Sequence, residues 1–186
     1  MNTLFTKRLI IRPWQISDAK DLFEYASSTN VGPRAGWAPH QSIADSINLI
    51  KNLFMKELYH WALVLPTHNN KVIGGIGVVK DSKRTFSGAR QMGYSMGQPF
   101  WGNEYMTEAA REVIKFTFEQ TNTQILCIYH YSDNQRSRRV IEKCGFTYEG
   151  CLRGCSQPYY NSPIHDDCCY SMTRDEYHTI YGSKQK

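Results

Sequence analysis

Short apolar runs alternate along this chain with segments whose apolar residues recur at helical spacing. Continuous or period-two apolar patterns are typical of strands, and spacings of three and four residues are typical of helices. The strand pattern occurs over residues 8–12, 61–65, 72–79, 125–131, 146–150 and 168–173, with a further strand that begins near Gly93. The chain is therefore predicted to alternate strands with helices.

Polar residues mark where the helices begin and end. Ser17 can cap one helix, and Ser42 with Asp45 forms a capping-box-like start for the next. A later helix follows Asn134, and Gly145 can end it in a left-handed cap. No linker or repeat interrupts these elements, so we expect a single domain that spans residues 1–186.

The order of the elements also indicates how the strands pair. A turn at residues 68–70 joins the strands over 61–65 and 72–79, which predicts a hairpin. We therefore predict an α+β fold, a mixed α/β domain in which helices flank a mostly antiparallel central sheet.

The composition narrows the class of protein. A hydrophobic fraction of 41% with 13% aromatics is typical of a globular domain, and the net charge of +5 is modest and scattered. No apolar run approaches the ~18 residues of a membrane span, and the amino terminus lacks a signal-peptide core. Six cysteines without a secretory signal favour reduced thiols. We expect a cytoplasmic protein without a membrane or nucleic-acid partner.

The segment from Gly93 to Ala110 is predicted to form a strand, a turn that contains Trp101 and Gly102, and a helix that begins between residues 103 and 107. Such a turn aims several free backbone N–H groups and the positive end of the helix dipole at one point. This geometry binds phosphate groups, so the segment predicts a phosphorylated cofactor.

Several short motifs then follow one another in a fixed order. They are Arg8-Leu-Ile-Ile-Arg12, Met92-Gly-Tyr94, Trp101-Gly-Asn-Glu-Tyr-Met-Thr-Glu-Ala109, and Asn134-Gln-Arg-Ser137 followed by Glu142-Lys-Cys-Gly-Phe146. The ordered set resembles the GNAT superfamily of acetyl-coenzyme A–dependent N-acetyltransferases, and within it the branch of ribosomal-protein N-terminal acetyltransferases (RimJ/RimL-like). The resemblance extends over nearly the whole chain.

The resemblance implies a GNAT-like fold with a splayed pair of central strands, and acetyl-coenzyme A as co-substrate. In this family the pantetheine arm bonds to the exposed backbone of the central strand and contacts an asparagine. Backbone N–H groups at the helix start hold the pyrophosphate. The positions implied for cofactor binding are Met96, Gly97, Gly102, Asn103, Glu104, Tyr105, Met106, Thr107, Asn134 and Ser137.

The chemistry implied is direct transfer of the acetyl group to an amine. The amine must lose a proton, the developing oxyanion needs a donor, and the departing thiolate must be protonated. A backbone N–H near Met96 or Gly97 is the candidate donor to the carbonyl. Ser137 lies where the family often places a hydroxyl near the leaving sulfur and is the candidate thiolate donor, with Tyr94 as a further catalytic candidate.

Two residues depart from the family pattern. Glu104 stands where the turn usually holds a second small residue, and its carboxylate would repel a pyrophosphate unless its side chain points outward. Gln91 stands where many relatives carry a glutamate that can act as general base, and an amide does not accept a proton at neutral pH. The general base is therefore not assigned from the sequence. The candidates are a water relay and the side chains of Tyr94, His130, His165 and Asp166.

Two other patterns predict no site of their own. The glycine-rich run at residues 74–77 lies inside an apolar strand with no helix after it, which excludes a dinucleotide fingerprint. The late cysteines lack the C-x2-C spacing of a zinc knuckle, so no metal site is expected. For Cys127 and Cys144 we expect core packing.

Two basic segments could contact a ligand. Arg136, Arg138 and Arg139 form either a solvated helix face or contacts to the phosphates of an adenine nucleotide. The loop that carries Arg34 and Trp37 lies where relatives bind the acceptor, although a plain surface loop is also open.

The sequence thus predicts an enzyme that moves the acetyl group of acetyl-coenzyme A to a primary amine, either a protein N-terminus or a small molecule. The alternative is a degenerate acyl-coenzyme A–binding module without turnover, which Gln91 and Glu104 favour. A nucleic-acid-binding domain is the weakest option, because aromatic residues do not interleave with a basic stripe. Exposed sheet edges often pair between subunits, so a homodimer also stays open.

Overall fold

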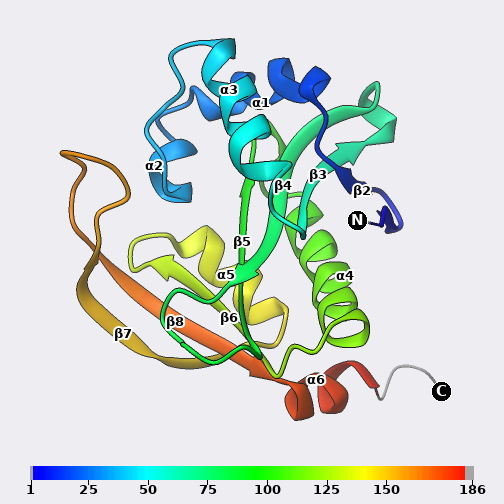
Figure 1. Cartoon of the computed structure of the whole chain (residues 1–186), viewed down its shortest axis with the longest axis vertical. Helices are drawn as coiled ribbons and strands as arrows, with labels where there is room; N and C mark the ends of the chain where they lie inside the picture. The colour runs from blue at the N-terminus through cyan, green and yellow to red at the C-terminus, as the bar shows by residue number, and fades with distance from the viewer. Residues whose placement is uncertain (1, 183–186) are drawn as a thin grey trace.

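The strands of this chain assemble into one eight-stranded sheet in the computed structural model, which describes residues 2–182 (Figure 1). Its order is β1-β2-β3-β4-β5-β6-β8-β7, and all neighbours are antiparallel except the parallel pair β5 and β6. The strands are β1 (Leu4–Phe5), β2 (Ile10–Pro13), β3 (His60–Leu65), β4 (Lys71–Lys80), β5 (Ala89–Met96), β6 (Ile125–Tyr131), β7 (Thr147–Ser156) and β8 (His165–Thr173). The predicted α+β fold with a mostly antiparallel sheet is confirmed, as is the hairpin of β3 and β4.

Helices cover both faces of this sheet. They are α1 (Ala19–Ala26), α2 (Gly32–Ala35), α3 (Ile43–Leu49), α4 (Tyr105–Gln120), α5 (Gln135–Lys143) and α6 (Arg174–Tyr181). Short 3-10 turns occur at Ile16–Asp18, Pro66–His68 and Gln98–Phe100, and a π-helical turn at Ile50–Phe54 extends α3. In Figure 1, α1 to α3 lie together at one end of the sheet, while α4 runs along the face that they leave free.

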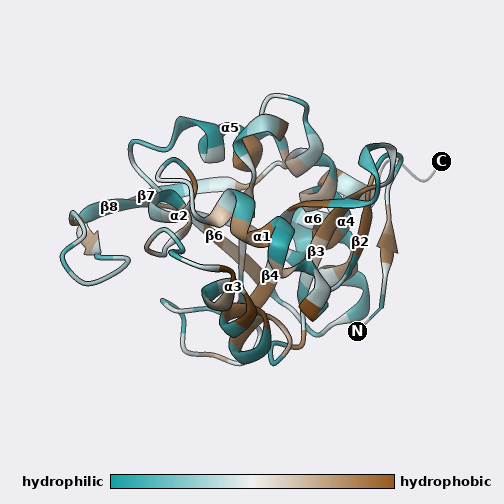
Figure 2. Ribbon diagram, turned by 90° about the horizontal axis from the view of Figure 1, so that it is seen from above, coloured by the Kyte–Doolittle hydropathy of each residue, from teal (hydrophilic) through white to brown (hydrophobic). Residues whose placement is uncertain are grey.

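The central strands are buried on both faces because successive side chains point to opposite sides. Trp61 and Leu63 of β3 pack in the core that contains α4, whereas Ala62 and Val64 pack against α1 and α3. Figure 2 shows the resulting hydrophobic strands enclosed between more polar helices. This double burial explains why β3 and β4 appear in the sequence as continuous apolar runs.

The predicted helix signals meet different outcomes. The Ser42 side chain accepts from the N–H of Asp45 in a capping box, and Gly145 adopts φ +85° after α5, so both predictions are confirmed. Ser17 does not cap a helix, and that prediction is wrong. The helical turn instead begins after Gln15, and the Asp18 carboxylate accepts from the Gln15 N–H and pairs with both terminal nitrogens of Arg12.

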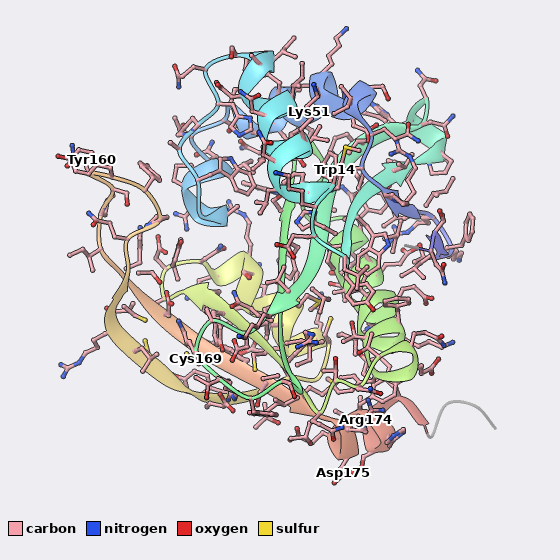
Figure 3. The ribbon with its side chains drawn as sticks, viewed as in Figure 1. Trp14, Lys51, Tyr160, Cys169, Arg174 and Asp175 are labelled. Carbon is pink, nitrogen blue, oxygen red and sulfur yellow. The ribbon has the colours of Figure 1, made fainter. Side chains whose placement is uncertain are left out.

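The last third of the chain differs most from expectation. Strand β7 is longer than predicted, because it is an edge strand whose residues are mostly exposed and lack an alternating apolar pattern. Helix α6 was not predicted. Arg174 anchors its start by donating to the carbonyls of Phe118, Thr121 and Thr123 where α4 ends (Figure 3). The loop between β7 and β8 projects from the body and carries the exposed Tyr160.

Candidate active site

Strands β5 and β6 run side by side only over their first halves. Their parallel pairing extends from Ala89 with Ile125 to Met92 with Ile128 and then stops. Parallel partners normally exchange hydrogen bonds along their length, so the divergence leaves backbone groups without a strand partner. The splayed pair predicted from the resemblance is therefore present.

Near the end of β5, the backbone N–H groups point alternately toward β4 and toward this opening. Gly97 donates to the carbonyl of Ile73 on β4 at 2.9 Å, so its N–H is not available to a ligand. Because backbone groups alternate in direction along a strand, the N–H of Met96 points the other way, toward β6. The Met96 carbonyl accepts from the indole N–H of Trp101 at 2.8 Å, which holds the end of the strand against the turn. Of the two predicted donors, Gly97 is bonded to β4, and Met96 is the one that faces the opening.

The turn after β5 collects further free donors at the start of α4. Among the hydrogen bonds of the described residues, none has as its donor any of the six consecutive backbone N–H groups from Gly102 to Thr107. The side-chain amide of Asn103 donates to the carbonyls of Phe100 and Trp101, which fixes the turn. With the dipole of the 16-residue helix α4 behind them, these groups form an anion-binding site.

Glu104 lies inside this turn in a strained conformation. Its φ of +62° is in the left-handed region, which is unfavourable for any residue other than glycine. Its carboxylate pairs with the ammonium of Lys143, the last residue of α5. That hydrogen bond lowers the pKa of Glu104, so the side chain is a charge-neutralised carboxylate rather than an unpaired one.

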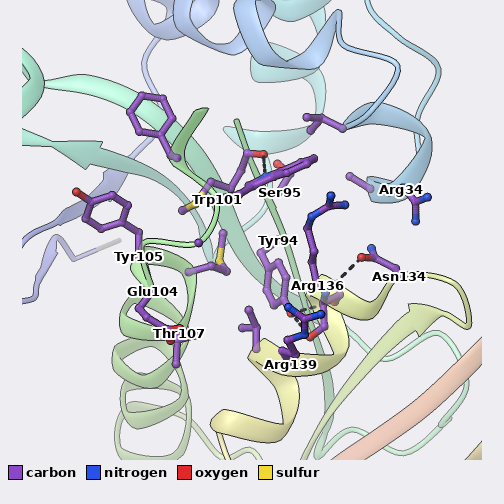
Figure 4. Close-up of a pocket in the computed structure, with 18 of the residues that line it drawn as sticks. Arg34, Tyr94, Ser95, Trp101, Glu104, Tyr105, Thr107, Asn134, Arg136 and Arg139 are labelled. Carbon is purple, nitrogen blue, oxygen red and sulfur yellow. Dashed lines mark hydrogen bonds between the residues drawn. The ribbon is translucent and has the colours of Figure 1, made fainter. Parts of the chain in front are cut away.

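A cavity of about 330 Å³ lies between the turn, the end of β5 and the first turns of α5 (Figure 4). Arg136 lies over the ring of Trp101, with its guanidinium carbon 4.3 Å from the ring centroid. Arg139 and Lys143 also line the cavity, whereas Arg138 faces Glu142 on its own helix. The cavity therefore combines free N–H groups with several cationic side chains, which suits an extended anionic ligand.

Ser137 and Tyr94 meet at the inner end of this cavity. Their side-chain oxygens lie 3.0 Å apart, and either can be the donor. Asn134 caps α5 by accepting from the N–H of Ser137, which fixes the first turn of the helix against the opening. Burial raises the pKa of Tyr94, so its phenol stays protonated at neutral pH and can donate a proton but not serve as a base.

A second cavity, of about 310 Å³, lies where β5 and β6 have separated. Its walls include β5, β6, the loop after β4, and parts of α2 and β8. The residues that it shares with the first cavity are Arg34, Ala35, Tyr94, Asn134 and Ser137. The two cavities thus meet at the Tyr94–Ser137 pair.

The second cavity contains a buried charge pair. Asp167 is 4% exposed, and one of its carboxylate oxygens accepts from Lys83 at 2.9 Å and from Ser156 at 2.7 Å. Its other oxygen, Oδ1, has no hydrogen-bond partner within the described residues. Because buried acceptors rarely stay unsatisfied, this oxygen is a candidate contact for a ligand with an N–H group.

Among the candidates for the general base, His130 lines the second cavity, whereas His165 and Asp166 lie elsewhere. Gln91 lines the second cavity, and its side-chain oxygen accepts from the backbone and the hydroxyl of Ser82. His165 stacks on Tyr131, and Asp166 accepts from the N–H of Gly154; neither lines either of the two cavities described here.

The sequence did not mark Lys83, Asp167 or Lys143 as site residues. It also did not predict that Trp101 stacks with an arginine. Lys83 and Asp167 are 84 positions apart, and no local pattern relates them. Trp101 was noted only as a turn residue, although an aromatic side chain beside a glycine turn is a signal that could have marked it.

The patterns dismissed from the sequence also have structural roles. Residues 74–77 lie within β4, and Cys127 and Cys144 are buried in the core, where burial raises the pKa of each thiol to about 12. Within residues 2–182, no group of three or more His, Cys, Asp or Glu residues could hold a metal ion. In the same range, no helix has the length and apolar character needed to cross a membrane.

Comparison with known proteins gives consistent results. The family model of the acetyltransferase (GNAT) domain matches residues 8–147. The uncharacterized N-acetyltransferase p20 of Bacillus licheniformis is 26% identical over 156 residues, which cover 82% of this chain and 86% of that protein. A GNAT-family acetyltransferase structure from Bacillus anthracis has a TM-score of 0.81 at 22% identity and covers 94% of this chain and 100% of its own. The structure of the ribosomal L7/L12 alpha-N-protein acetyltransferase RimL in complex with coenzyme A has a TM-score of 0.76 at 18% identity, over 94% of this chain and 99% of its own.

Proposed function

This chain belongs to the acetyltransferase (GNAT) domain family and is an acetyl-coenzyme A–dependent acetyltransferase, and we propose that it transfers the acetyl group directly to a primary amine. The acceptor is the N-terminus of a protein or a small-molecule amine. The eight strands of the described residues share one sheet, which supports our further proposal that residues 1–186 act as a single GNAT domain.

One observation carries this proposal. The two cavities meet at Tyr94, Asn134 and Ser137, at the point where β5 and β6 separate. A direct transfer needs donor and acceptor to enter from different sides and meet at one place, with a proton donor between them. The shared wall supports this arrangement, with its hydroxyl pair as our proposed donor.

The first cavity fits acetyl-coenzyme A. The free N–H groups from Gly102 to Thr107 would hold the pyrophosphate, and Arg136 or Arg139 would contact further phosphate oxygens. The pairing of Glu104 with Lys143 limits the repulsion expected from a carboxylate in this turn. Met96 and Asn134 would contact the pantetheine arm. When bound, the cofactor supplies a thioester whose carbonyl carbon can accept an amine.

Three groups of this chain would then act on the reacting atoms. The N–H of Met96 donates to the carbonyl oxygen as negative charge develops on it. Ser137 donates a proton to the sulfur as it leaves, and Tyr94 restores that proton through their shared hydrogen bond. Because burial keeps the phenol of Tyr94 protonated, the pair is a proton donor across the neutral pH range.

The second cavity supports an amine as the acceptor. The unpartnered Oδ1 of Asp167 is a negatively charged acceptor in a buried position. A primary ammonium offers three N–H donors and a positive charge, so it satisfies this oxygen better than a hydroxyl does. Acetyl transfer to nitrogen rather than to oxygen follows from this preference.

Release of coenzyme A thiol from acetyl-coenzyme A tests the proposal. The purified chain is assayed with peptides that have a free N-terminus, with single amino acids and with small polyamines. Peptides are included because RimL is an alpha-N-protein acetyltransferase. The matched controls are the same peptides with the N-terminus already acetylated, and the product mass is measured for each active acceptor.

We expect thiol release with at least one free amine, no release with its blocked counterpart, and a product heavier by one acetyl group. Binding of acetyl-coenzyme A without release against every amine in the panel would contradict the proposal. Activity with peptides alone, or with small amines alone, assigns the acceptor class.

A further inference from the structure

We infer that His130 is the group that takes the proton from the attacking amine, an inference that rests on the function proposed above. His130 lies on β6 two residues beyond Ile128, the last residue of β6 to pair with β5. If the parallel pairing continued, His130 would stand opposite Tyr94, which is two residues beyond Met92. The imidazole therefore lies at the opening itself and lines the cavity assigned to the acceptor.

One hydrogen bond fixes the tautomer of this imidazole. Its Nδ1 lies 2.8 Å from the backbone carbonyl oxygen of Tyr131. A carbonyl can only accept, so Nδ1 carries the hydrogen, and in the neutral ring Nε2 then carries a lone pair. His130 thus presents a proton acceptor at Nε2.

That lone pair has nothing to bind within the described residues. The side chain is 5% exposed, and Nε2 has no hydrogen-bond partner there. Its ring packs against Tyr170 of β8, with centroids 5.5 Å apart, on a face of β6 that otherwise buries Leu126 and Ile128. An aliphatic residue would fill this position without an unsatisfied nitrogen, so the histidine costs free energy that packing alone does not explain.

The other groups considered for the base do not compete. Tyr94 is held protonated by burial, and the Gln91 amide is not basic. His165 and Asp166 do not line the acceptor cavity. Asp167 lines it as well, but its carboxylate already accepts from Lys83 and Ser156, and we assign it to holding the ammonium.

The protons taken and given in the transfer balance when His130 acts as the general base. The amine nitrogen forms a bond to the carbonyl carbon while the bond from that carbon to sulfur breaks. Nε2 of His130 takes one proton from the nitrogen, and Ser137 gives one proton to the sulfur. An acceptor that binds as an ammonium first loses one proton to solvent, and the neutral amine then attacks. His130 and the Tyr94–Ser137 pair return to their starting states when the imidazolium passes its proton to that pair through the cavity. The net products are the amide, the thiol and the one proton that the ammonium lost.

Replacement of His130 by asparagine is the sharpest test. The amide nitrogen of asparagine occupies the place of Nδ1 and can still donate to the Tyr131 carbonyl, but the side chain has no basic atom. We expect kcat in the amine assay to fall by roughly 100-fold or more, a typical loss for a general base. The dissociation constant for coenzyme A and the thermal midpoint should stay close to those of the wild type. Tyr170→Phe, which alters the packing partner alone, should retain kcat.

Two further readouts separate catalysis from structure. Added imidazole should restore part of the activity of His130→Ala and none of that of Ser137→Ala. Two-bond ¹⁵N–¹H NMR spectra of the wild type, assigned by comparison with His130→Asn, should show the tautomer with hydrogen on Nδ1. A kcat of His130→Asn within threefold of wild type, absence of rescue, or hydrogen on Nε2 would overturn the inference. A wild-type chain inactive with every amine would instead contradict the proposed function, and the inference with it.

Discussion

The phenolic oxygen of Tyr94 lies 3.0 Å from the hydroxyl oxygen of Ser137, and this contact joins the diverging end of β5 to the first turn of α5. Because the pair lies where the two cavities meet, we expect Ser137→Ala to lower kcat by about 100-fold with little change in coenzyme A affinity. Steady-state kinetics at saturating acetyl-coenzyme A, together with calorimetric binding of coenzyme A, would measure both quantities.

Tyr94→Phe and the double variant are the controls. If the two hydroxyls act as one donor, the double variant should lose no more activity than Ser137→Ala alone, because residues that act as a unit are not additive. Losses that multiply in the double variant would show that the hydroxyls act independently, and an unchanged kcat in Ser137→Ala would remove it as the thiolate donor.

Glu104 lies in the turn from Gly102 to Thr107, where the sequence predicts that its carboxylate repels a pyrophosphate. Its contacts in the structure predict the effect of replacing it. Glu104→Gly relieves a left-handed conformation, removes a negative charge from the turn and frees Lys143 for a phosphate oxygen. We expect the affinity for coenzyme A to rise about tenfold at low ionic strength, equivalent to about 1.4 kcal/mol. Calorimetric titration at two salt concentrations should show that the gain shrinks as salt rises.

Lys143→Ala provides the matched background for this experiment. In that background Glu104→Gly should gain less, because no ammonium remains to be released toward the ligand. An equal gain in both backgrounds would mean that Lys143 takes no part, and a weaker affinity in Glu104→Gly would show that the Glu104–Lys143 pair organises the site.

Asp167 gives a prediction about the acceptor. Asp167→Asn keeps the shape of the side chain but removes its charge, so the KM for the amine should rise about tenfold while the KM for acetyl-coenzyme A stays unchanged. Initial rates with each substrate varied in turn would separate the two constants.

This substitution also leaves Lys83 without its carboxylate, so a second variant is needed. Lys83→Gln combined with Asp167→Asn removes both charges and restores a neutral hydrogen-bonding pair. We expect its thermal midpoint to recover relative to Asp167→Asn while the KM for the amine stays high. If the KM recovers along with the stability, Asp167 supports the fold and does not contact the amine.

The strand–turn–helix and the order of the elements could be predicted from the sequence because these features are local. A glycine turn, an asparagine cap and the apolar run of a doubly buried strand each depend on a few neighbouring residues, and Asn134 and Gly145 were placed correctly. Ser17 was misplaced because the helical turn begins earlier, after Gln15, where the Asp18 carboxylate gains an ion pair with Arg12 from a strand that precedes it.

Contacts between distant segments could not be predicted in the same way. The pairing of Glu104 with Lys143 and that of Lys83 with Asp167 depend on how α5 and β8 approach β5, and the sequence around each residue does not encode a partner. The sequence also could not predict whether the N–H of Met96 or that of Gly97 faces the opening. That choice follows from the register between β4 and β5, which are separate segments of the chain.

His60 predicts a pH dependence of stability that is separate from catalysis. Its ring stacks on Phe54 with centroids 4.1 Å apart and occupies the space left by Gly77, and burial lowers its pKa from 6.5 to about 4. The unfolded chain therefore binds a proton below pH 6.5 that the folded protein does not bind until about pH 4. The stability from the neutral ring is fully present above pH 6.5 and is lost as the pH falls toward 4, by roughly 3 kcal/mol in total.

His60→Phe keeps the stacked ring without the titration, so its free energy of unfolding in urea should decline less steeply over this range than that of the wild type. Equal slopes for the two proteins would show that His60 protonates alike in both states, whereas a shallower slope in His60→Phe ties the acid sensitivity of the β3–β4 face to this one imidazole.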